Sequence, residues 1–195
     1  VVGQNAAQMA VGMGAHVTIV DRSLDVLRRL DNQFGNRIQT LYSTQDAVEE
    51  MATKADLIIG AVLIPGASAP KLITRDAVKS MSSGTAMVDV AIDQGGCFET
   101  SHATTHDEPT YIVDDVVHYC VANMPGAVAR TSAAALNNAT LPYVLALANH
   151  GIFCALRNDP HLMNGLNVHE GKITNKFVAA AHELEYVSAA QAGLI

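Results

Sequence analysis

VVGQNAAQMAVGMGAHVTIVD, residues 1–21, couples a helix of small side chains to a strand that ends in an aspartate. Alanine and glycine recur along residues 3–14, and such small side chains let a helix lie close against a sheet. Mostly β-branched residues fill residues 16–21 and favour a strand. Gly3 begins the helix, and Asp21 ends the strand about 20 positions later.

This order of residues allows two interpretations. In dinucleotide-binding βαβ units a strand runs into three spaced glycines, and the backbone approaches a pyrophosphate at a helix N-terminus. An acidic side chain about 20 residues further on receives the ribose hydroxyls. Gly3 corresponds only to the third glycine of such a turn. The alternative is an ordinary helix-start glycine followed by an ordinary strand-end carboxylate, and this stretch alone leaves both open.

The chain continues as short apolar runs that alternate with helical stretches. The predicted strands are 16–21, 37–42, 55–63, 85–92 and 116–123, and the predicted helices are 3–14, 23–34, 44–54 and 73–81. Ser23 and Thr44 are placed as N-caps and Gly35 as a helix stop. Nearly continuous apolar strands separated by helices indicate a parallel sheet covered on both faces, which is a Rossmann-type doubly wound α/β fold.

The sequence changes character at Ala129, where a long Ala- and Leu-rich helix begins, followed by a tail of weaker periodicity. We expect Pro142 to kink this helix or to start a new one, because proline removes a backbone donor. The predicted organisation is a dinucleotide-binding domain over residues 1–128, then a connecting helix and a further segment over residues 129–195.

Composition narrows the class of protein. The 195 residues are 49% hydrophobic and 16% charged, which is enough to bury a core. No apolar run approaches the roughly 18 uninterrupted residues of a membrane span, so we expect a soluble, cytoplasmic protein with no membrane partner. The formal charge of −7 argues against nucleic acid as a partner. Three widely spaced cysteines indicate neither a disulfide framework nor a zinc site, and Cys97 and Cys120 are expected to be buried thiols.

Two longer stretches carry particular motifs. Residues 60–101 read GAVLIPGASAPKLITRDAVKSMSSGTAMVDVAIDQGGCFETS, and residues 116–143 read VVHYCVANMPGAVARTSAAALNNATLPY. Within and beside them, IGAVLIPGA, APKL, VDVAIDQGGCFETS, HYCVANMPGA and NATLPYVL are long and specific, and together they closely resemble the alanine dehydrogenase family. The related transhydrogenase subunit is a less similar member of the same superfamily. The resemblance implies that this chain is the C-terminal, NAD-binding half of such an enzyme, beginning inside the glycine turn, so that the sheet lacks its first strand.

The resemblance also implies site residues. The positions that match cofactor-binding residues of the family are Val1, Gly3, Asp21, Ser43, Val62, Leu63, Val90, Ala91, Ile92, Asp93, His102, Val121, Ala122, Asn123 and Met124. Val1 and Gly3 would lie under the pyrophosphate, and Asp21 would hold the adenosine ribose, which favours NAD over NADP. Residues 90–93 would pass the nicotinamide ring, with residues 121–124 as the facing wall. His102 and Val26 stand where relatives usually carry basic residues, so NAD affinity is expected to be reduced.

Asp93 is the catalytic candidate, because a carboxylate beside the nicotinamide can stabilise positive charge on the substrate nitrogen and relay protons. The implied reaction is the reversible, NAD-dependent oxidation of L-alanine to pyruvate and ammonium. The family's lysine and histidine for the substrate belong to the N-terminal half, which is the expected partner, and a homo-oligomer is expected. Open alternatives are an NAD-binding fragment or split-enzyme subunit inactive alone, and the NAD-binding transhydrogenase subunit.

A metal site at His102 and His106 is a weaker interpretation. Their spacing of i and i+4 can place two ligands on one helical face. Thr104, Thr105 and Asp107 make this segment a loop instead, and no third ligand is apparent. We therefore expect no metal.

Overall fold

The computed structural model describes residues 1–64 and 69–194, which form two compact units. The first unit comprises Val1–Leu63 and Ala69–Met124, and the second contains Ile64 and the chain from Pro125 onward. Residues 65–67 of the IGAVLIPGA motif lie outside the described residues.

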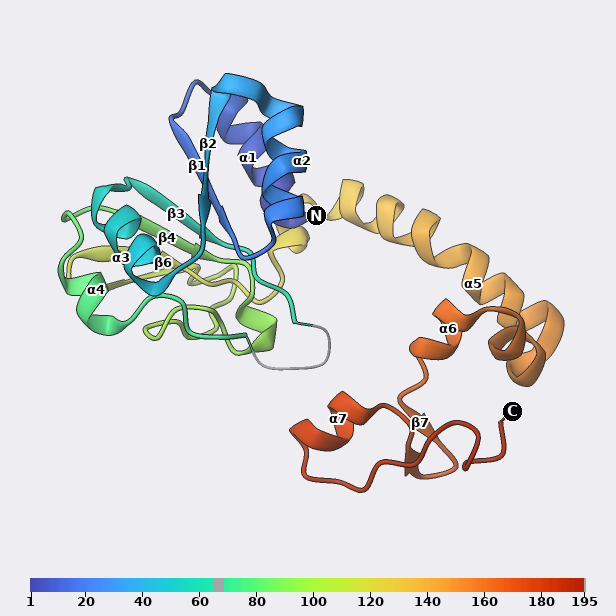
Figure 1. The fold of residues 1–195 in the computed structure, drawn as a ribbon. Coiled ribbons are helices and arrows are strands. Elements are labelled where there is room, and N and C mark those ends of the chain that lie inside the picture. The colour runs from blue at the N-terminus through green and yellow to red at the C-terminus, as the bar shows by residue number, and fades with distance from the viewer. Residues whose placement is uncertain (65–68, 195) are drawn as a thin grey trace. The chain divides into compact units, whose positions relative to one another are not determined.

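The first unit alternates helices and strands in the order expected of a doubly wound fold (Figure 1). Its elements are α1 (Val2–Gly12), β1 (Val17–Asp21), α2 (Leu24–Phe34), η1 (Gly35–Arg37), β2 (Ile38–Tyr42), α3 (Gln45–Lys54), β3 (Leu57–Gly60), α4 (Arg75–Lys79), β4 (Ala86–Asp89), η2 (Ile92–Gln94), β5 (Thr110–Val113) and β6 (Val116–Tyr119).

The strands of this unit form two sheets. β1 pairs with β2 in parallel, and the second sheet has the order β3-β4-β6-β5, in which only β5 runs antiparallel. Helix α1 contacts both β1 and β3. Among the described strands neither β1 nor β3 has a second neighbour, so the two sheets are the halves of a Rossmann-type sheet that lacks its first strand.

The helix boundaries follow the capping residues. The Ser23 hydroxyl accepts a hydrogen bond from the Val26 N–H at 3.3 Å, and the Thr44 hydroxyl accepts one from the Ala47 N–H at 3.2 Å. Gly35 ends α2 with φ of 59°, a conformation that costs glycine little. These three predictions are confirmed.

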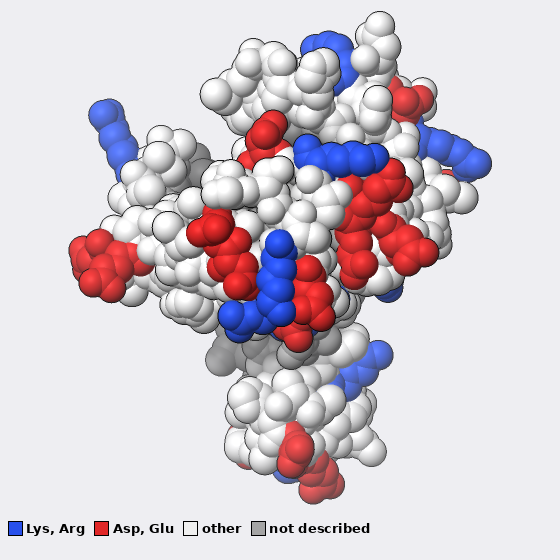
Figure 2. All heavy atoms as spheres, turned by 90° about the vertical axis from the view of Figure 1, so that its left-hand side faces the viewer, with Lys and Arg blue, Asp and Glu red and all other residues white. Residues whose placement is uncertain are grey.

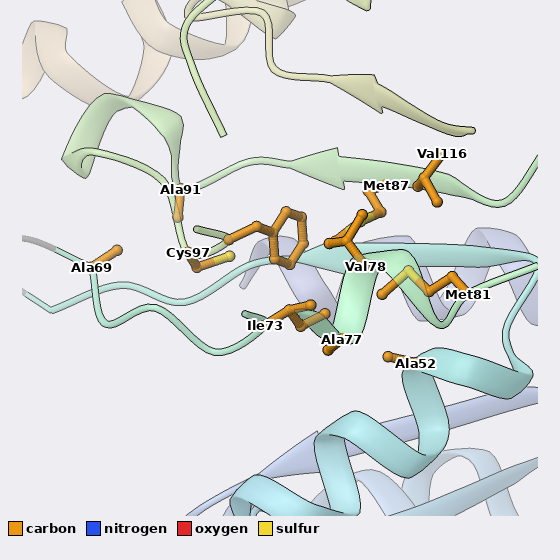
Figure 3. Packing of buried hydrophobic residues seen from close by; sticks show 11 residues of the cluster. Ala52, Ala69, Ile73, Ala77, Val78, Met81, Met87, Ala91, Cys97 and Val116 are labelled. Atoms are coloured by element: carbon orange, nitrogen blue, oxygen red, sulfur yellow. The ribbon is translucent and has the colours of Figure 1, made fainter. Parts of the chain in front are cut away.

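Two hydrophobic clusters stabilise this unit. The smaller one packs α1 against α2 and β2 through Ala7, Leu30, Phe34 and Ile38. The larger one brings side chains of α3, α4, β4, β6 and the loop after β4 together (Figure 3). Its members are Ala52, Ala69, Ile73, Ala77, Val78, Met81, Met87, Ala91, Cys97, Phe98 and Val116. The loop after β4 is therefore part of the core, which fixes its backbone.

Three predicted strands were too long, and one strand was not predicted. The strands predicted over 55–63 and 116–123 end at Gly60 and Tyr119. The strand predicted over 85–92 ends at Asp89, because the chain turns into η2 before the two glycines. A further strand, β5, precedes β6 in a hairpin, where Asp114 and Asp115 both have positive φ, at 50° and 63°. Such a two-residue turn matches the twist of paired strands.

The second unit is dominated by α5 (Ala129–Asn158). Pro142 was expected to kink this helix or to start a new one, but the helix continues through Pro142. Its non-helical residue is Gly151, with φ of 74° and ψ of 163°. The remaining elements are η3 (Met124–Val128) at the boundary, α6 (Pro160–Asn164), β7 (Val168–His169), β8 (Lys172–Ile173) and α7 (Lys176–Ala181).

Helix α5 exposes much apolar surface. Within the described chain, Met124–Asn158 is the one helical stretch long and apolar enough to cross a membrane by length and composition, with a mean hydropathy of 1.4 in its most apolar window. Only 11% of that window is buried. Polar residues such as Asn137 and Asn138 interrupt its apolar runs, so length and composition alone do not decide what covers it.

Candidate functional site

The first site segment joins the ends of β1 and β2. Asp21 is the last residue of β1, and its backbone carbonyl accepts a hydrogen bond from the Ser43 N–H at 3.0 Å. Its carboxylate accepts a bond from the Ser23 N–H at 2.7 Å. Asp21 and Ser43 are therefore brought together, with the Asp21 side chain partly exposed.

The second segment combines the start of α1 with the end of β3. A side-chain carbon at Gly3 would lie 3.4 Å from the Ala61 Cβ, so the glycine permits close approach of α1 to β3. Val62 and Leu63 come directly after β3, and Leu63 is exposed. Val1, at the N-cap of α1, is fully exposed.

The third segment comes after β4. Val90 donates its N–H to the Gly60 carbonyl at 2.8 Å, next to the parallel pair of Gly60 and Asp89. Ala91 and Ile92 are buried, whereas Asp93 is exposed in the middle of η2. The sequence placed Asp93 at a strand end, but the structure places it on a 3₁₀ turn beyond the strand.

Asp89 is the centre of this segment, and sequence reasoning missed it. Its carboxylate is fully buried and accepts hydrogen bonds from four neighbours. They are the N–H groups of Ala91 (3.0 Å), Cys97 (2.8 Å) and Phe98 (3.4 Å), and the Ser101 hydroxyl (2.5 Å). The bonds close a loop of the chain around one carboxylate.

The two glycines of the DQGG motif shape this loop. Gly95 and Gly96 have φ of 85° and 76°, a region that other residues rarely adopt. A side-chain carbon at Gly96 would lie 2.8 Å from an Asp89 carboxylate oxygen and 2.7 Å from the Ser101 Cβ. The consecutive glycines were the sequence signal that the strand ends early and that the chain folds back on Asp89.

The fourth segment comes after β6. Val121 forms a parallel bridge with Thr104, and Ala122 donates its N–H to the Thr104 carbonyl at 3.2 Å. A ring nitrogen of His106 lies 2.6 Å from the Asn123 carbonyl oxygen. Val121 is buried, while residues 122–124 are more exposed.

Three rings lie in a row beside this segment. The Tyr111 ring stacks on His102 with centroids 3.7 Å apart and on His118 with centroids 5.0 Å apart. Tyr111 donates its hydroxyl to the Thr100 carbonyl at 3.0 Å and accepts the His102 N–H at 3.0 Å. His102 is thus fixed by a tyrosine that the sequence did not single out, since β5 was not predicted.

His118 is fully buried and holds fixed partners. One ring nitrogen lies 3.0 Å from the Val116 carbonyl and the other 2.7 Å from the Thr100 hydroxyl. Because a carbonyl accepts only, the ring nitrogen beside Val116 donates to it, and in a neutral imidazole the other nitrogen then accepts from the Thr100 hydroxyl. Burial, the main cause, lowers the pKa of His118; the hydrogen bond to the Val116 carbonyl opposes this, and His102 adds a smaller lowering.

The buried thiols are unreactive by environment. Cys97 donates its thiol toward an Asp89 oxygen at 3.4 Å, and burial, followed by the Asp89 charge, raises its pKa far above the usual range. Cys120 is also buried, whereas Cys154 is exposed. The expectation of buried thiols at Cys97 and Cys120 is confirmed.

Charge on the surface is mixed. Figure 2 shows one face on which Lys and Arg side chains stand singly beside groups of Asp and Glu. Exposed ion pairs of this kind include Lys54 with Glu50 at 2.6 Å and Lys79 with Asp76 at 2.8 Å. That face therefore offers no continuous basic surface.

Chemically, the arrangement offers small and apolar side chains at strand ends, together with the carboxylates of Asp21 and Asp93, which are partly exposed and exposed, respectively. Open α/β sheets bind ligands at the carboxyl ends of their strands. The segments after β1, β2, β3, β4 and β6 all lie at such ends.

Comparison with known proteins gives consistent matches. Residues 1–176 match the family model described as "Alanine dehydrogenase/PNT, C-terminal domain". Alanine dehydrogenase from Halomonas elongata is 63% identical over 190 residues, which cover 97% of this chain and 51% of that protein. Alanine dehydrogenase from Mycolicibacterium smegmatis is 56% identical over 189 residues, with the same shares covered.

Solved structures agree. A structure named L-alanine dehydrogenase superposes with a TM-score of 0.83 at 49% identity, covering 93% of this chain and 50% of that one. The transhydrogenase from Sinorhizobium meliloti superposes with a TM-score of 0.56 at 29% identity, covering 67% of this chain and 36% of that one. The chain spans about half the length of the curated relatives that it matches.

Proposed function

Because the chain belongs to the family of the alanine dehydrogenase/PNT C-terminal domain, we propose that it is the cofactor-binding half of an NAD-dependent alanine dehydrogenase. The reaction converts L-alanine, water and NAD to pyruvate, ammonium, NADH and a proton, reversibly. One observation supports this most: the five predicted segments at residues 21, 43, 62–63, 90–93 and 121–124 all lie at the carboxyl ends of strands.

The residues present fit a dinucleotide. Helix α1 has 11 residues, and its N-terminus offers N–H groups and a partial positive charge to a pyrophosphate, with Gly3 keeping the backbone close. In the part of the chain that the structure describes, one Asp21 oxygen accepts from Ser23 and the other is open to a ribose hydroxyl. The Asp21 carboxylate would repel a 2′-phosphate, which favours NAD over NADP.

NAD, when bound, accepts the hydride from the alanine Cα. Residues 90–92 and 121–124 would hold the nicotinamide ring, and the buried Ala91 and Ile92 would exclude water on their side. Asp93 stabilises positive charge at the substrate nitrogen and takes up a proton when water adds to the substrate carbon. His102, fixed on Tyr111, lies at the end of the same loop and contributes to the cofactor side.

Other groups come from outside this chain. The substrate carboxylate and the imine need basic residues, and we propose that these belong to the other half of the relatives' length. The same half, or further copies in a homo-oligomer, would cover the apolar residues exposed on α5, which include Leu136, Leu141, Val144 and Ile152. We place residues 1–128 as the cofactor domain of a cytoplasmic enzyme, with residues 129–195 linking it to the substrate half.

The test uses the full-length polypeptide that contains this chain. Asp93→Asn should lower kcat for alanine-dependent NAD reduction by about a hundredfold, with the Kd for NAD changed less than about threefold. Asp107→Asn is the matched control, since Asp107 is also an exposed loop aspartate of this unit and should leave kcat unchanged. Unaltered turnover in Asp93→Asn would remove its catalytic role.

A second measurement separates the alternatives. This chain alone should bind NAD by calorimetry and should not oxidise alanine. Robust alanine oxidation by this chain alone would contradict the assignment of essential groups to the other half. Hydride exchange between NAD and NADP without alanine oxidation by the full-length protein would favour the transhydrogenase alternative, which the weaker structural similarity supports.

A further inference from the structure

Asp93 lies on the η2 turn, Ile92–Gln94, which two glycines follow. Gly95 and Gly96 both have positive φ, which rotates their carbonyl groups away from regular strand pairing. Yet the ammonium group of Lys71 lies 2.6 Å from the Gly95 carbonyl oxygen and 2.8 Å from that of Gly96. One ammonium group therefore donates to both carbonyl oxygens directly after η2.

The backbone around Lys71 runs along the same loop. Ala69 donates its N–H to the Gln94 carbonyl at 2.9 Å, and Leu72 donates to the Cys97 carbonyl at 2.7 Å. Ile73 and Phe98 then form a parallel bridge. Residues 69–73 thus form a strap along residues 94–98, and Lys71 lies in its middle.

The turn that carries Asp93 is held from two sides. On the buried side, Asp89 receives the N–H groups of Ala91 and Cys97, which flank the turn. On the exposed side, the Lys71 ammonium holds the carbonyls of Gly95 and Gly96. Among the ion pairs of the described residues, none includes Lys71 or Asp93, so Lys71 acts through the backbone rather than by pairing with the Asp93 charge.

We propose that Lys71 is a positioning residue for Asp93: it fixes the Ile92–Gln94 turn so that the Asp93 carboxylate keeps its place beside the reacting atoms. The inference rests on the catalytic role proposed for Asp93. A misplacement of about 1 Å can cost a reaction about a hundredfold in rate, so a cation that fixes two consecutive carbonyls has a functional effect beyond stability.

The variants are chosen so that folding is preserved. Lys71 is exposed, so Lys71→Met removes the ammonium without opening the core. Lys71→Arg keeps donors that reach carbonyls and should restore part of the effect. Lys54→Met is the matched control, because Lys54 is an exposed lysine whose ammonium binds only the Glu50 carboxylate on its own helix.

The first readout needs no cofactor. Amide hydrogen exchange of the full-length protein should speed up by about tenfold at Gly95, Gly96 and Cys97 in Lys71→Met, and not at α1 or β1. The control variant should exchange as the parent does. Unchanged exchange at these amides would overturn the proposal, whether or not the protein oxidises alanine.

The second readout separates positioning from stability. In Lys71→Met, kcat for alanine oxidation should fall about tenfold or more, while the Kd for ADP, a probe of the adenosine side, stays within about twofold. Faster exchange with unchanged kcat would show a purely structural role and overturn the proposal. Weaker ADP binding by Lys71→Met would overturn the positioning role and would indicate instead that Lys71 contacts the cofactor directly. If the parent protein does not oxidise alanine, the proposed function fails, whereas the exchange data still decide whether Lys71 holds the turn.

Discussion

The ends of β1 and β4 carry the same residue in opposite roles. Asp21 ends β1, is partly exposed, and its carboxylate accepts one hydrogen bond, from the N–H of Ser23 two residues on. Asp89 ends β4, is fully buried, and accepts bonds from three backbone N–H groups, one hydroxyl and the Cys97 thiol. The first carboxylate is open to a ligand, and the second holds a loop of its own chain.

The difference lies in the segment of chain after each strand. After Asp21 the chain enters α2, capped by Ser23, and the carboxylate stays partly exposed. After Asp89 the chain passes a 3₁₀ turn and two positive-φ glycines, which fold residues 97–101 back over the carboxylate. An acidic strand end is therefore a binding candidate only when the next segment leaves it uncovered.

The largest effect is expected for Asp89→Ala. Removing the carboxylate leaves three N–H groups and a hydroxyl in the core without a partner, which should cost about 3–5 kcal/mol of unfolding free energy. Urea unfolding of the two variants Asp89→Ala and Asp21→Ala measures the contrast. Asp21→Ala should lose less than about 1 kcal/mol, and equal losses would break the comparison.

Gly60→Ala tests the packing opposite Asp89. A side-chain carbon at Gly60 would lie 2.3 Å from the Cys97 sulfur and 2.8 Å from the Phe98 ring, both fully or almost fully buried. The clash should cost about 2–3 kcal/mol, measured by thermal unfolding. Gly12→Ala on α1, where nothing lies within 4 Å, should be neutral or stabilising and serves as the control.

Much of the fold was predictable because periodicity and capping are local signals. The strand at 16–21, the helix caps at Ser23 and Thr44 and the stop at Gly35 depend on residues close in sequence. The end of β4 was not predicted, because apolar residues continue through Ile92 while the two glycines after it reverse the chain. Helix α5 continues through Pro142, and its non-helical residue is Gly151, whose φ of 74° glycine adopts readily.

The assignment of Asp21 and Asp93 to a ligand site stays a prediction: Asp21 is partly exposed at the end of β1, and Asp93 is exposed on the turn after β4. The contacts that support these segments were not predicted. Lys71, Asp89 and His118 were missed, because their roles depend on partners about 8 to 25 residues away that come close only through the fold.

Asp21→Ala tests whether the Asp21 carboxylate, unlike that of Asp89, binds a ligand. If the open oxygen of Asp21 receives ribose hydroxyls, the variant should weaken NAD binding by about twentyfold, the value of one charge-assisted hydrogen bond. Asp25→Ala, which removes an exposed carboxylate on the next helical turn, is the control and should bind normally. Calorimetric titration measures both, and equal affinities would assign Asp21 a structural role only.

The smallest effect is expected for the pH dependence of stability that His118 causes. His118 lies on β6, which pairs with β4. Burial lowers the pKa of His118 in the folded protein below its ordinary value of 6.5, so the unfolded chain binds a proton that the folded chain rejects. Unfolding free energy should therefore fall as pH drops below about 6.5 and level off once the folded-state pKa has been passed. The hydrogen bond to the Val116 carbonyl and the Asp89 charge raise the pKa, and the exposed His102 lowers it further, but burial dominates. His118→Gln should flatten the pH dependence measured by urea unfolding, whereas His16→Gln, at an exposed histidine before β1, should leave it unchanged. An unchanged slope in His118→Gln would mean that the pKa of His118 is the same in the folded and the unfolded protein, so that burial does not disfavour the protonated imidazole.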